Sequence, residues 1–273
     1  MYGRGGRKNI QCSWLIEGLE DETVIVTVKA IKQKHNDCRS IRHQTNSLDC
    51  QGGNDPFLKL EISDVPWDNI EVPIACLCSE DNLPYTIKSR GSSILLNMTI
   101  LGMNPEDDFN NFNFDVEYEF LKMKKCHGGN RKLSAPAGGV LLSYEEDPEE
   151  CNSRPWLLEA APGFSFLLTL PRATLANESC STDSRLVLRV PGAKDPLIVV
   201  CPAADHDATI QFVWPPIPGL QNSSNYAPYM SDIYKEVPQL VAQWEPRMAS
   251  PLTMHWLHLQ NPARFYPLKV CVV

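Results

Sequence analysis

The sequence has no apolar run long enough to cross a membrane and no excess of positive charge. No stretch of its 273 residues approaches the ~20 apolar residues of a transmembrane helix, so any membrane anchor must lie outside this chain. Its 25 basic residues are outnumbered by 33 acidic ones, which gives a net charge of -8. Because nucleic-acid binding requires a basic surface, this balance argues against nucleic acid as a partner.

The sequence also lacks the short motifs of the common enzyme classes. It contains no Gly-x-Ser-x-Gly elbow, no His-Glu-x-x-His, no Gly-x-Gly-x-x-Gly and no phosphate loop. His255 and His258 lie in a predicted strand at positions that face opposite sides, so one metal cannot bind both. His206 has no companion histidine nearby. We therefore expect a protein that is not an enzyme and that holds no cofactor.

A secretory signal is missing as well, since residues 1–8 are polar and glycine-rich, and we expect them to be disordered. The ten cysteines are irregularly spaced and fit neither a zinc ribbon nor a Cys-x-x-Cys redox motif, so they predict disulfides. Disulfides form in oxidising compartments, which indicates a secreted protein or the ectodomain of a plasma-membrane protein. We therefore expect the natural chain to begin upstream of Met1.

Three glycosylation acceptors agree with an extracellular location. They begin at Asn97, Asn177 and Asn222, and none has proline in the middle position. Around the first, apolar residues occupy every second position of 94–100. This alternation directs Asn97 to the solvent face of a strand, where a glycan can be accommodated.

Alternation of apolar and polar residues is the main structural signal of the chain. Val116, Tyr118 and Phe120 share one face of a predicted strand, which we expect to be buried. The same pattern recurs at 24–28, 164–170, 186–190 and 210–214. The best helix candidate, 231–244, is interrupted by Pro238. We therefore predict an all-β protein built from antiparallel β-sandwiches.

The second half of the sequence resembles a CUB domain, a jelly-roll-like β-sandwich found in extracellular proteins. The resemblance is carried by Cys126, Gly128-Gly129, Gly138 to Ser143, Cys151, Trp156, "EAAPG" at 159–163, "IQFVW" at 210–214 and "LTMHWLHL" at 252–259. It implies the disulfides Cys126–Cys151 and Cys180–Cys201. The domain would span 126–262, with a proline-rich insertion at about 215–250 and a C-terminal tail at 263–273.

The first half, residues 9–122, is similar to the same family but lacks its beginning. The segment "QCSWLIEGLEDETVIVTV" at 11–28 resembles the region around Cys151 and Trp156, which gives Cys12 the place of the second family cysteine. Its partner would then precede this chain. We expect this domain to be the weaker of the two and to expose a sheet edge that invites association with another chain.

Four further cysteines of the first half surround the position of the later cysteine pair of the family. They are Cys38, Cys50, Cys76 and Cys78. We expect two bridges among them, and four cysteines allow three pairings. Cys76 and Cys78 are two positions apart in a predicted strand, and we expect them to take different partners rather than each other. Cys12 and Cys271 are left over, and a Cys12–Cys271 bridge between the chain ends is the alternative to two unpaired cysteines.

Calcium is not favoured by the residues present. Many CUB domains bind calcium through a glutamate and two aspartates, and the resemblance places one of these aspartates at Asp183, which follows Cys180 by three residues. Leu175 stands where the glutamate is expected, and Trp214 with Pro215 replaces the second aspartate. A single carboxylate does not hold calcium, so we predict no metal site.

The resemblance implies a non-catalytic binding module with extracellular protein or glycan partners. We expect Trp14, Trp156 and Trp214, at strand positions, to lie in the core. The candidate contact residues are two tryptophans near prolines and an acidic loop, namely Trp67, Trp244, Glu145, Glu146 and Asp147. The alternative interpretation is an accessory or ectodomain fragment of a larger secreted protease or single-pass receptor.

Overall fold

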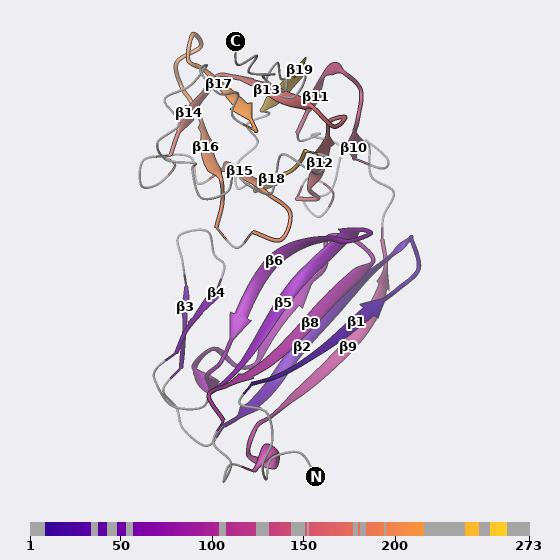
Figure 1. The fold of residues 1–273 in the computed structure, drawn as a ribbon, viewed down its shortest axis with the longest axis vertical. Coiled ribbons are helices and arrows are strands. Elements are labelled where there is room, and N and C mark those ends of the chain that lie inside the picture. The colour runs from indigo at the N-terminus through magenta and orange to yellow at the C-terminus, as the bar shows by residue number, and fades with distance from the viewer. Residues whose placement is uncertain are drawn as a thin grey trace, which may run out of the picture. The chain divides into compact units, whose positions relative to one another are not determined.

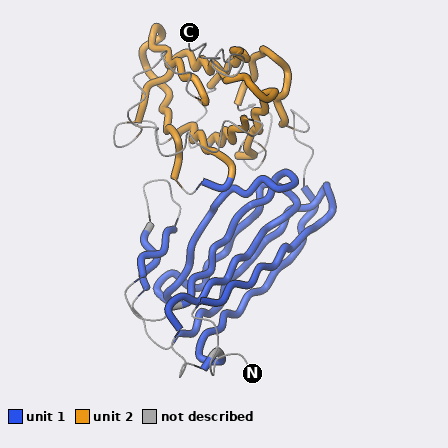
Figure 2. Tube along the Cα trace, in the orientation of Figure 1, with its two compact units in different colours: residues 1–125, 192–194 blue, residues 126–191, 195–273 orange. Residues whose placement is uncertain are grey.

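The computed structural model of the chain is built almost entirely of β-strands (Figure 1). It describes residues 9–33, 38–42, 48–52, 57–103, 108–123, 131–142, 151, 153–176, 180, 184–193, 195–215, 238–245 and 252–260. The chain divides into two compact units, residues 1–125 with 192–194 and residues 126–191 with 195–273 (Figure 2). The predicted all-β class is therefore confirmed.

The first unit is a sandwich of two sheets. Six strands form one sheet in the order β1-β8-β5-β6-β4-β3, and three form the other in the order β7-β2-β9. All pairs are antiparallel except β4 with β6. The strands are β1 (Ile10–Glu17), β2 (Glu22–Lys32), β3 (Arg39–Arg42), β4 (Leu48–Gln51), β5 (Phe57–Trp67), β6 (Ile70–Leu77), β7 (Tyr85–Lys88), β8 (Ser93–Leu101) and β9 (Asn113–Lys122), with short 3-10 turns at Glu80–Asn82 and Phe109–Asn111.

The core of the first unit lies between these two sheets. Val24, Val26 and Val28 of β2 are fully buried, as the alternation predicts, and pack in one cluster with the inner faces of β5 and β8. Each such aliphatic side chain contributes about 1.5–3 kcal/mol of stabilisation when it leaves water. On β8, Leu96 and Met98 are buried whereas Asn97 lies half-buried on the opposite face. The glycosylation acceptor is thus outside the core.

The second unit is also a sandwich of two sheets. One has the order β10-β12-β18-β15-β16-β14 and the other the order β11-β19-β13-β17. Only β10 with β12 is a parallel pair. The strands are β10 (Lys132–Leu133), β11 (Ala137–Leu141), β12 (Trp156–Glu159), β13 (Phe164–Pro171), β14 (Ala173–Leu175), β15 (Arg185–Arg189), β16 (Ile198–Pro202), β17 (Thr209–Trp214), β18 (Gln239–Glu245) and β19 (Thr253–Gln260).

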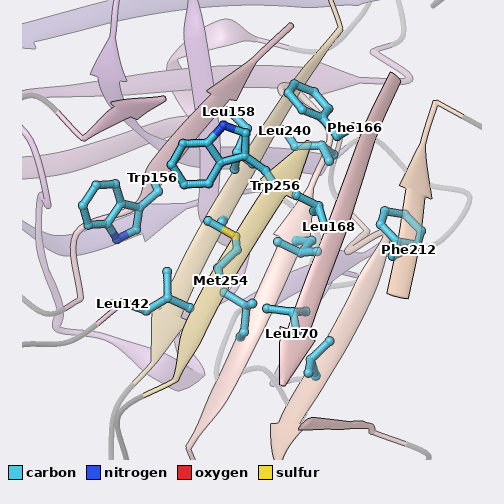
Figure 3. Close-up of a cluster of buried hydrophobic side chains, with 14 of the residues drawn as sticks. Leu142, Trp156, Leu158, Phe166, Leu168, Leu170, Phe212, Leu240, Met254 and Trp256 are labelled. Atoms are coloured by element: carbon cyan, nitrogen blue, oxygen red, sulfur yellow. The ribbon is translucent and has the colours of Figure 1, made fainter. Parts of the chain in front are cut away.

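Aromatic side chains fill the core of the second unit. Figure 3 shows Trp156, Phe166, Phe212 and Trp256 among the leucines of this cluster. Trp156 and Trp214, expected in the core, are 3% and 1% exposed. Each large ring removes about 150–250 Å² from water, so these few residues dominate the stability of the sandwich.

Two predictions for the segment around Trp244 are wrong. Residues 239–245, within the expected insertion, form β18, which lies between β12 and β15 in the middle of the larger sheet. Trp244 is fully buried in the core and is not an exposed anchor. The physical reason is that Pro238 lies before β18 and does not interrupt it. Leu240, Ala242 and Trp244 occupy alternate positions, so they share the face of the strand that packs into the core.

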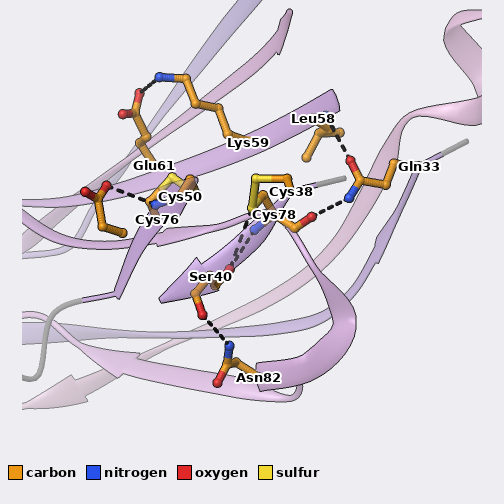
Figure 4. Close-up of a disulfide and its surroundings, with 11 residues drawn as sticks. Gln33, Cys38, Ser40, Cys50, Leu58, Lys59, Glu61, Cys76, Cys78 and Asn82 are labelled. Carbon is orange, nitrogen blue, oxygen red and sulfur yellow. Dashed lines mark hydrogen bonds and ion pairs between the residues drawn. A yellow bond between two sulfur atoms is a disulfide. The ribbon is translucent and has the colours of Figure 1, made fainter. Parts of the chain in front are cut away.

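Two disulfides join residues at β3 and β4 to the end of β6 in the first unit (Figure 4). They join Cys38 to Cys78 and Cys50 to Cys76, with Cα–Cα distances of 5.7 and 5.4 Å. Cys76 and Cys78 therefore have different partners. Hydrogen bonds support the bridges: the amide of Cys78 donates to the Ser40 hydroxyl at 3.0 Å, and the Gln33 side chain donates to the Cys78 carbonyl.

The second unit contains the Cys180–Cys201 disulfide that the resemblance implies, with a Cα–Cα distance of 5.3 Å. Cys151 is buried and disulfide-bonded. Its expected partner, Cys126, lies outside the described residues. Cys12 is a free cysteine, and Cys271 also lies outside the described part of the chain.

The two units share one strand connectivity. Taken in chain order, β1, β2 and β4 to β9 correspond one by one to β12 to β19. The sheet order β1-β8-β5-β6-β4 then matches β12-β18-β15-β16-β14, and β7-β2-β9 matches β17-β13-β19. One pair differs in direction, because β4 is parallel to β6 whereas β14 is antiparallel to β16.

The second unit has two strands without a described counterpart in the first. β10 lies at the edge beside β12, and β11 lies at the edge beside β19. These are the edges that correspond to β1 and β9. The first unit is therefore open, in its described part, at the side where the second unit is covered.

Candidate functional site

An apolar groove opens between the two sheets of the first unit, along β1 and β9. Both are edge strands: among the described strands, β1 pairs only with β8 and β9 only with β2. The groove has a volume of about 420 Å³. Its lining comes mostly from the inward faces of these two strands and consists of Trp14, Leu15, Ile16, Glu17, Leu96, Phe114, Val116, Tyr118 and Phe120.

Aromatic rings form the walls of the groove. The ring of Trp14 on β1 meets the ring of Phe114 on β9 edge to face, with centroids 5.4 Å apart. Tyr118 and Phe120 are packed in the same manner, at 5.7 Å. Edge-to-face pairs of this kind are favourable, so each of these four rings has an aromatic partner in the groove.

These aromatic residues are exposed, although the sequence predicts them to be buried. Trp14 is 42% exposed, Tyr118 58% and Phe120 39%, and the core predictions for all three are wrong. The alternation correctly places them on the inward face of their strands. They remain in contact with solvent because no described strand lies beyond the edges of β1 and β9.

The corresponding tryptophan of the second unit is covered. Trp156, on β12, has the place that Trp14 has on β1, and it is 3% exposed. The guanidinium carbon of Arg131 lies 4.8 Å from the centroid of its ring, as in a cation–π contact. The main chain of Arg131 also bonds to β12, since the amide of Leu157 donates to the carbonyl of Arg131 at 2.9 Å.

β11 covers the other edge of the second unit. It pairs antiparallel with β19, and the Trp256 indole donates to the Ala135 carbonyl at 2.9 Å. The strand lies directly on the neighbouring side chains: a Cβ on Gly138 would be 2.5 Å from the Trp256 ring, closer than real Cβ atoms approach. Glycine at this position therefore permits the contact that leaves Trp256 only 7% exposed.

Carboxylates lie on the outward face of β9. Asp115, Glu117 and Glu119 occupy alternate exposed positions. Glu117 forms an ion pair with Lys29 on β2, and this hydrogen bond raises the pKa of the exposed Lys29 side chain. Glu17 on β1 is the carboxylate among the residues that line the groove. The open edge is thus apolar on its inner side and acidic on its outer side.

A free thiol belongs to the same strand face as Trp14. Cys12 is half-buried and packs against the core of the first unit. In the second unit, the cysteine that precedes the corresponding tryptophan, Cys151, is disulfide-bonded. A free thiol therefore lies on this strand face, whereas its counterpart in the second unit is bonded.

None of the described contact residues proposed from the sequence lines this groove. Trp67 is half-buried at the end of β5, opposite Ile70, and Trp244 lies in the core of the second unit. His206 and His255 are exposed, and His258 is half-buried. The remaining candidates lie outside the described residues; they are Glu145, Glu146, Asp147, Asp183, Asn177 and Asn222.

The groove itself was missed because periodicity identifies the face of a strand but not its neighbours. One signal was available. Aromatic residues at Phe114, Tyr118 and Phe120 alternate along the last strand of a domain that the sequence already predicts to be incomplete. An incomplete sandwich with an aromatic edge strand is expected to present those rings to solvent.

The described residues contain one cluster of potential metal ligands, formed by Cys38, Cys50 and Cys78. All three sulfurs are in disulfides, so they offer no thiolate to a metal. No helix within the described ranges is both long and apolar enough to span a membrane.

Lowering the pH below about 6.5 should destabilise the second unit through His258. Its ring contacts Phe166, with centroids 5.3 Å apart, and burial lowers its pKa from the ordinary value of 6.5. The unfolded chain then binds the proton more tightly than the folded one. The contribution of neutral His258 to the unfolding free energy is therefore complete above the unfolded-state pKa. It is lost as the pH falls through the lowered folded-state pKa.

The check is urea unfolding of wild type and His258→Phe at about pH 7 and pH 5, on either side of an ordinary histidine pKa. The variant should lose part of the pH dependence of the unfolding midpoint. An identical pH dependence in both proteins would show that His258 does not contribute.

Comparisons with known proteins give a family and weak structural likenesses. A family model described as "Domain of unknown function (DUF7805)" matches residues 122–264. No curated protein matches the chain. Among solved structures, the CUB1-EGF-CUB2 domain of human MASP-1/3 is 9% identical with a TM-score of 0.28, covering 93% of this chain and 95% of its own. The corresponding domains of rat MASP-1 are 10% identical with a TM-score of 0.28, covering 92% of both chains. Likenesses this weak carry no argument about this chain.

Proposed function

This chain belongs to the family of the domain of unknown function DUF7805, and we propose that it is a non-catalytic extracellular binding protein built from two CUB-like domains. Its partner is another protein, which docks on the open side of the first unit. The observation that carries this proposal is the aromatic groove between β1 and β9. An exposed apolar patch bordered by polar residues is typical of a protein interaction site.

Two observations support the CUB-like assignment and the extracellular location. The motifs around Cys126, Cys151 and Trp156 resemble the family, and both units share one sandwich connectivity. Three disulfides are present in the described residues, and Cys151 is bonded as well. Such a density of disulfides is maintained in oxidising environments.

The partner class follows from the groove lining. Trp14, Phe114 and Tyr118 offer ring faces and edges to an apolar side chain, and the adjoining strand edges offer backbone groups. A polypeptide has both complementary features, because it can pair with a sheet edge while its side chains enter pockets. A glycan can stack on the rings but cannot extend the sheet.

The test is a binding survey with the whole chain, produced by secretion so that its disulfides form. It is applied to arrays of purified secreted proteins, receptor ectodomains and glycans, and every signal is titrated by surface plasmon resonance. We expect saturable binding to a protein. Binding to glycans alone contradicts the protein partner, and the absence of any saturable binding contradicts the proposed function. Enzymatic turnover of any array member would contradict a non-catalytic role.

A further inference from the structure

We propose that the groove of the first unit binds an extended segment of a separate polypeptide, in which apolar and basic residues alternate. The segment adds a strand to the edge of β9 that no described strand joins, with its apolar side chains in the groove and its basic side chains on the outward face. This inference rests on the proposed binding function and assigns its site and the chemistry of its partner.

The second unit shows how such a sandwich edge is covered by an extended segment, and we expect the bound state of the first unit to be similar. There, residues 131–141 run along the edges that correspond to the open ones: β10 lies beside β12, and β11 pairs with β19. Arg131 stacks on Trp156 with its guanidinium carbon 4.8 Å from the ring centroid. An extended segment with a basic residue is therefore what closes this side of the sandwich within the same molecule.

The first unit has matching surfaces and no described segment in that place. Trp14 corresponds to Trp156 and is 42% exposed where its counterpart is 3% exposed. β9 corresponds to β19, and no described strand pairs with its other edge. A strand paired with β9 would direct every second side chain into the groove, against Phe114, Val116, Tyr118 and Phe120.

The acidic face of β9 sets the charge of the remaining side chains. The residues of an added strand that do not enter the groove lie on the outward face, beside Asp115, Glu117 and Glu119. Within the described residues, Lys29 is the basic group paired with this row, and it bonds to Glu117. Opposite charges across neighbouring strands are favourable, so the outward side chains of the partner are basic.

The same charges argue against a second copy of this chain as the occupant. Pairing β9 with another β9 would set Asp115, Glu117 and Glu119 against an identical row of carboxylates. Like charges directly opposite in a sheet are destabilising. The chain as a whole has a net charge of -8, which adds a general repulsion between copies. Charge therefore favours a basic segment of another protein over a second copy of this chain.

The experiment uses the full chain and a fluorescent peptide of alternating valine and lysine, with ten residues like β9. Two matched peptides replace lysine with glutamate or scramble the order, and a third carries N-methyl groups on alternate amides to block strand pairing. We expect saturable binding of the valine–lysine peptide by fluorescence anisotropy, at least about tenfold tighter than that of the other three.

Two protein variants locate the binding. Tyr118→Lys puts a positive charge in the groove and should weaken binding at least about tenfold. Leu175→Lys is the control, because Leu175 is 51% exposed on β14 in the second unit, and it should bind like wild type. Circular dichroism of both variants checks that they fold alike.

Several outcomes would overturn the inference. Equal binding by Tyr118→Lys and Leu175→Lys places the peptide elsewhere, and equal binding of the N-methylated peptide excludes strand addition. A dimer of the wild-type chain in analytical ultracentrifugation that Tyr118→Lys dissociates would identify a second copy as the occupant. If a protein found in the binding survey binds Tyr118→Lys as tightly as wild type, the proposed binding function still holds. The groove is then not the binding site.

Discussion

Replacing Trp244 with alanine should lower the unfolding free energy of the second unit by about 3–5 kcal/mol. The side chain is fully buried in the core cluster and belongs to β18, the strand between β12 and β15. Its removal leaves a cavity that the two sheets can fill only in part, because neighbouring strands fix their positions. Urea unfolding followed by far-ultraviolet circular dichroism measures the change.

The matched control for this prediction is Leu175→Ala in the same unit. Leu175 is half-exposed at the sheet edge, so its loss should change the unfolding free energy by less than about 0.5 kcal/mol. If Trp244→Ala were as stable as this control, the placement of β18 in the middle of the sheet would be wrong. The segment would then be the surface insertion that its prolines predict.

Removing the Cys38–Cys78 bridge should cost the first unit about 3 kcal/mol. The two cysteines are 40 residues apart, but the Cys50–Cys76 bridge lies within this loop and already joins most of it. With the inner bridge intact, the outer bridge closes a loop of only about 15 residues in the unfolded chain, made of residues 38–50 and 76–78. The length of this loop sets the expected loss of unfolding free energy in the chain-entropy description. The measurement is guanidinium unfolding of the double variant Cys38→Ser with Cys78→Ser.

Cys12→Ser is the control for the loss of sulfur without the loss of a bridge. Cys12 is a free, half-buried thiol, so this change should cost less than about 1 kcal/mol. A double variant as stable as Cys12→Ser would mean that the bridge does not constrain the unfolded chain. Non-reduced peptide mapping of the wild type establishes first that the bridge is present in the sample.

The strand faces could be predicted from the sequence, because a period of two is a local property of the chain. Val24, Val26 and Val28 were assigned to the inner face of β2, and they are buried. Trp156 and Trp214 were assigned to the core on the same grounds, and the structure confirms both. The different partners of Cys76 and Cys78 also followed from their spacing in a strand.

The cover on each face could not be predicted in the same way, because it depends on strands distant in the sequence. Trp14 and Trp156 have similar local sequences, yet one is half-exposed and the other buried. Arg131 and β10 lie beside Trp156, whereas no described strand lies beyond β1. Trp244 shows the converse error. Proline and polar residues near it resemble a loop, whereas its burial comes from the strands on either side of β18.

The contrast between the two units also gives the groove its physical meaning. An uncovered edge with apolar residues is a site for association, and natural sheets usually protect such edges. The second unit protects its corresponding edges with residues 131–141, including Gly138, which lies against Trp256. The first unit leaves its edge strands open in the described part, with an acidic row on one of them. The binding function proposed here depends on this difference.

Hydrogen–deuterium exchange with and without the valine–lysine peptide tests that dependence most directly. Strand addition protects the amides of the edge it joins, so exchange should slow in peptides covering β9 (Asn113–Lys122) and the adjoining β1 (Ile10–Glu17). Exchange in β14 (Ala173–Leu175), an edge strand of the second unit, should not change. Unchanged exchange in β9 at peptide saturation would contradict the account, because the open edge would then take no part in binding.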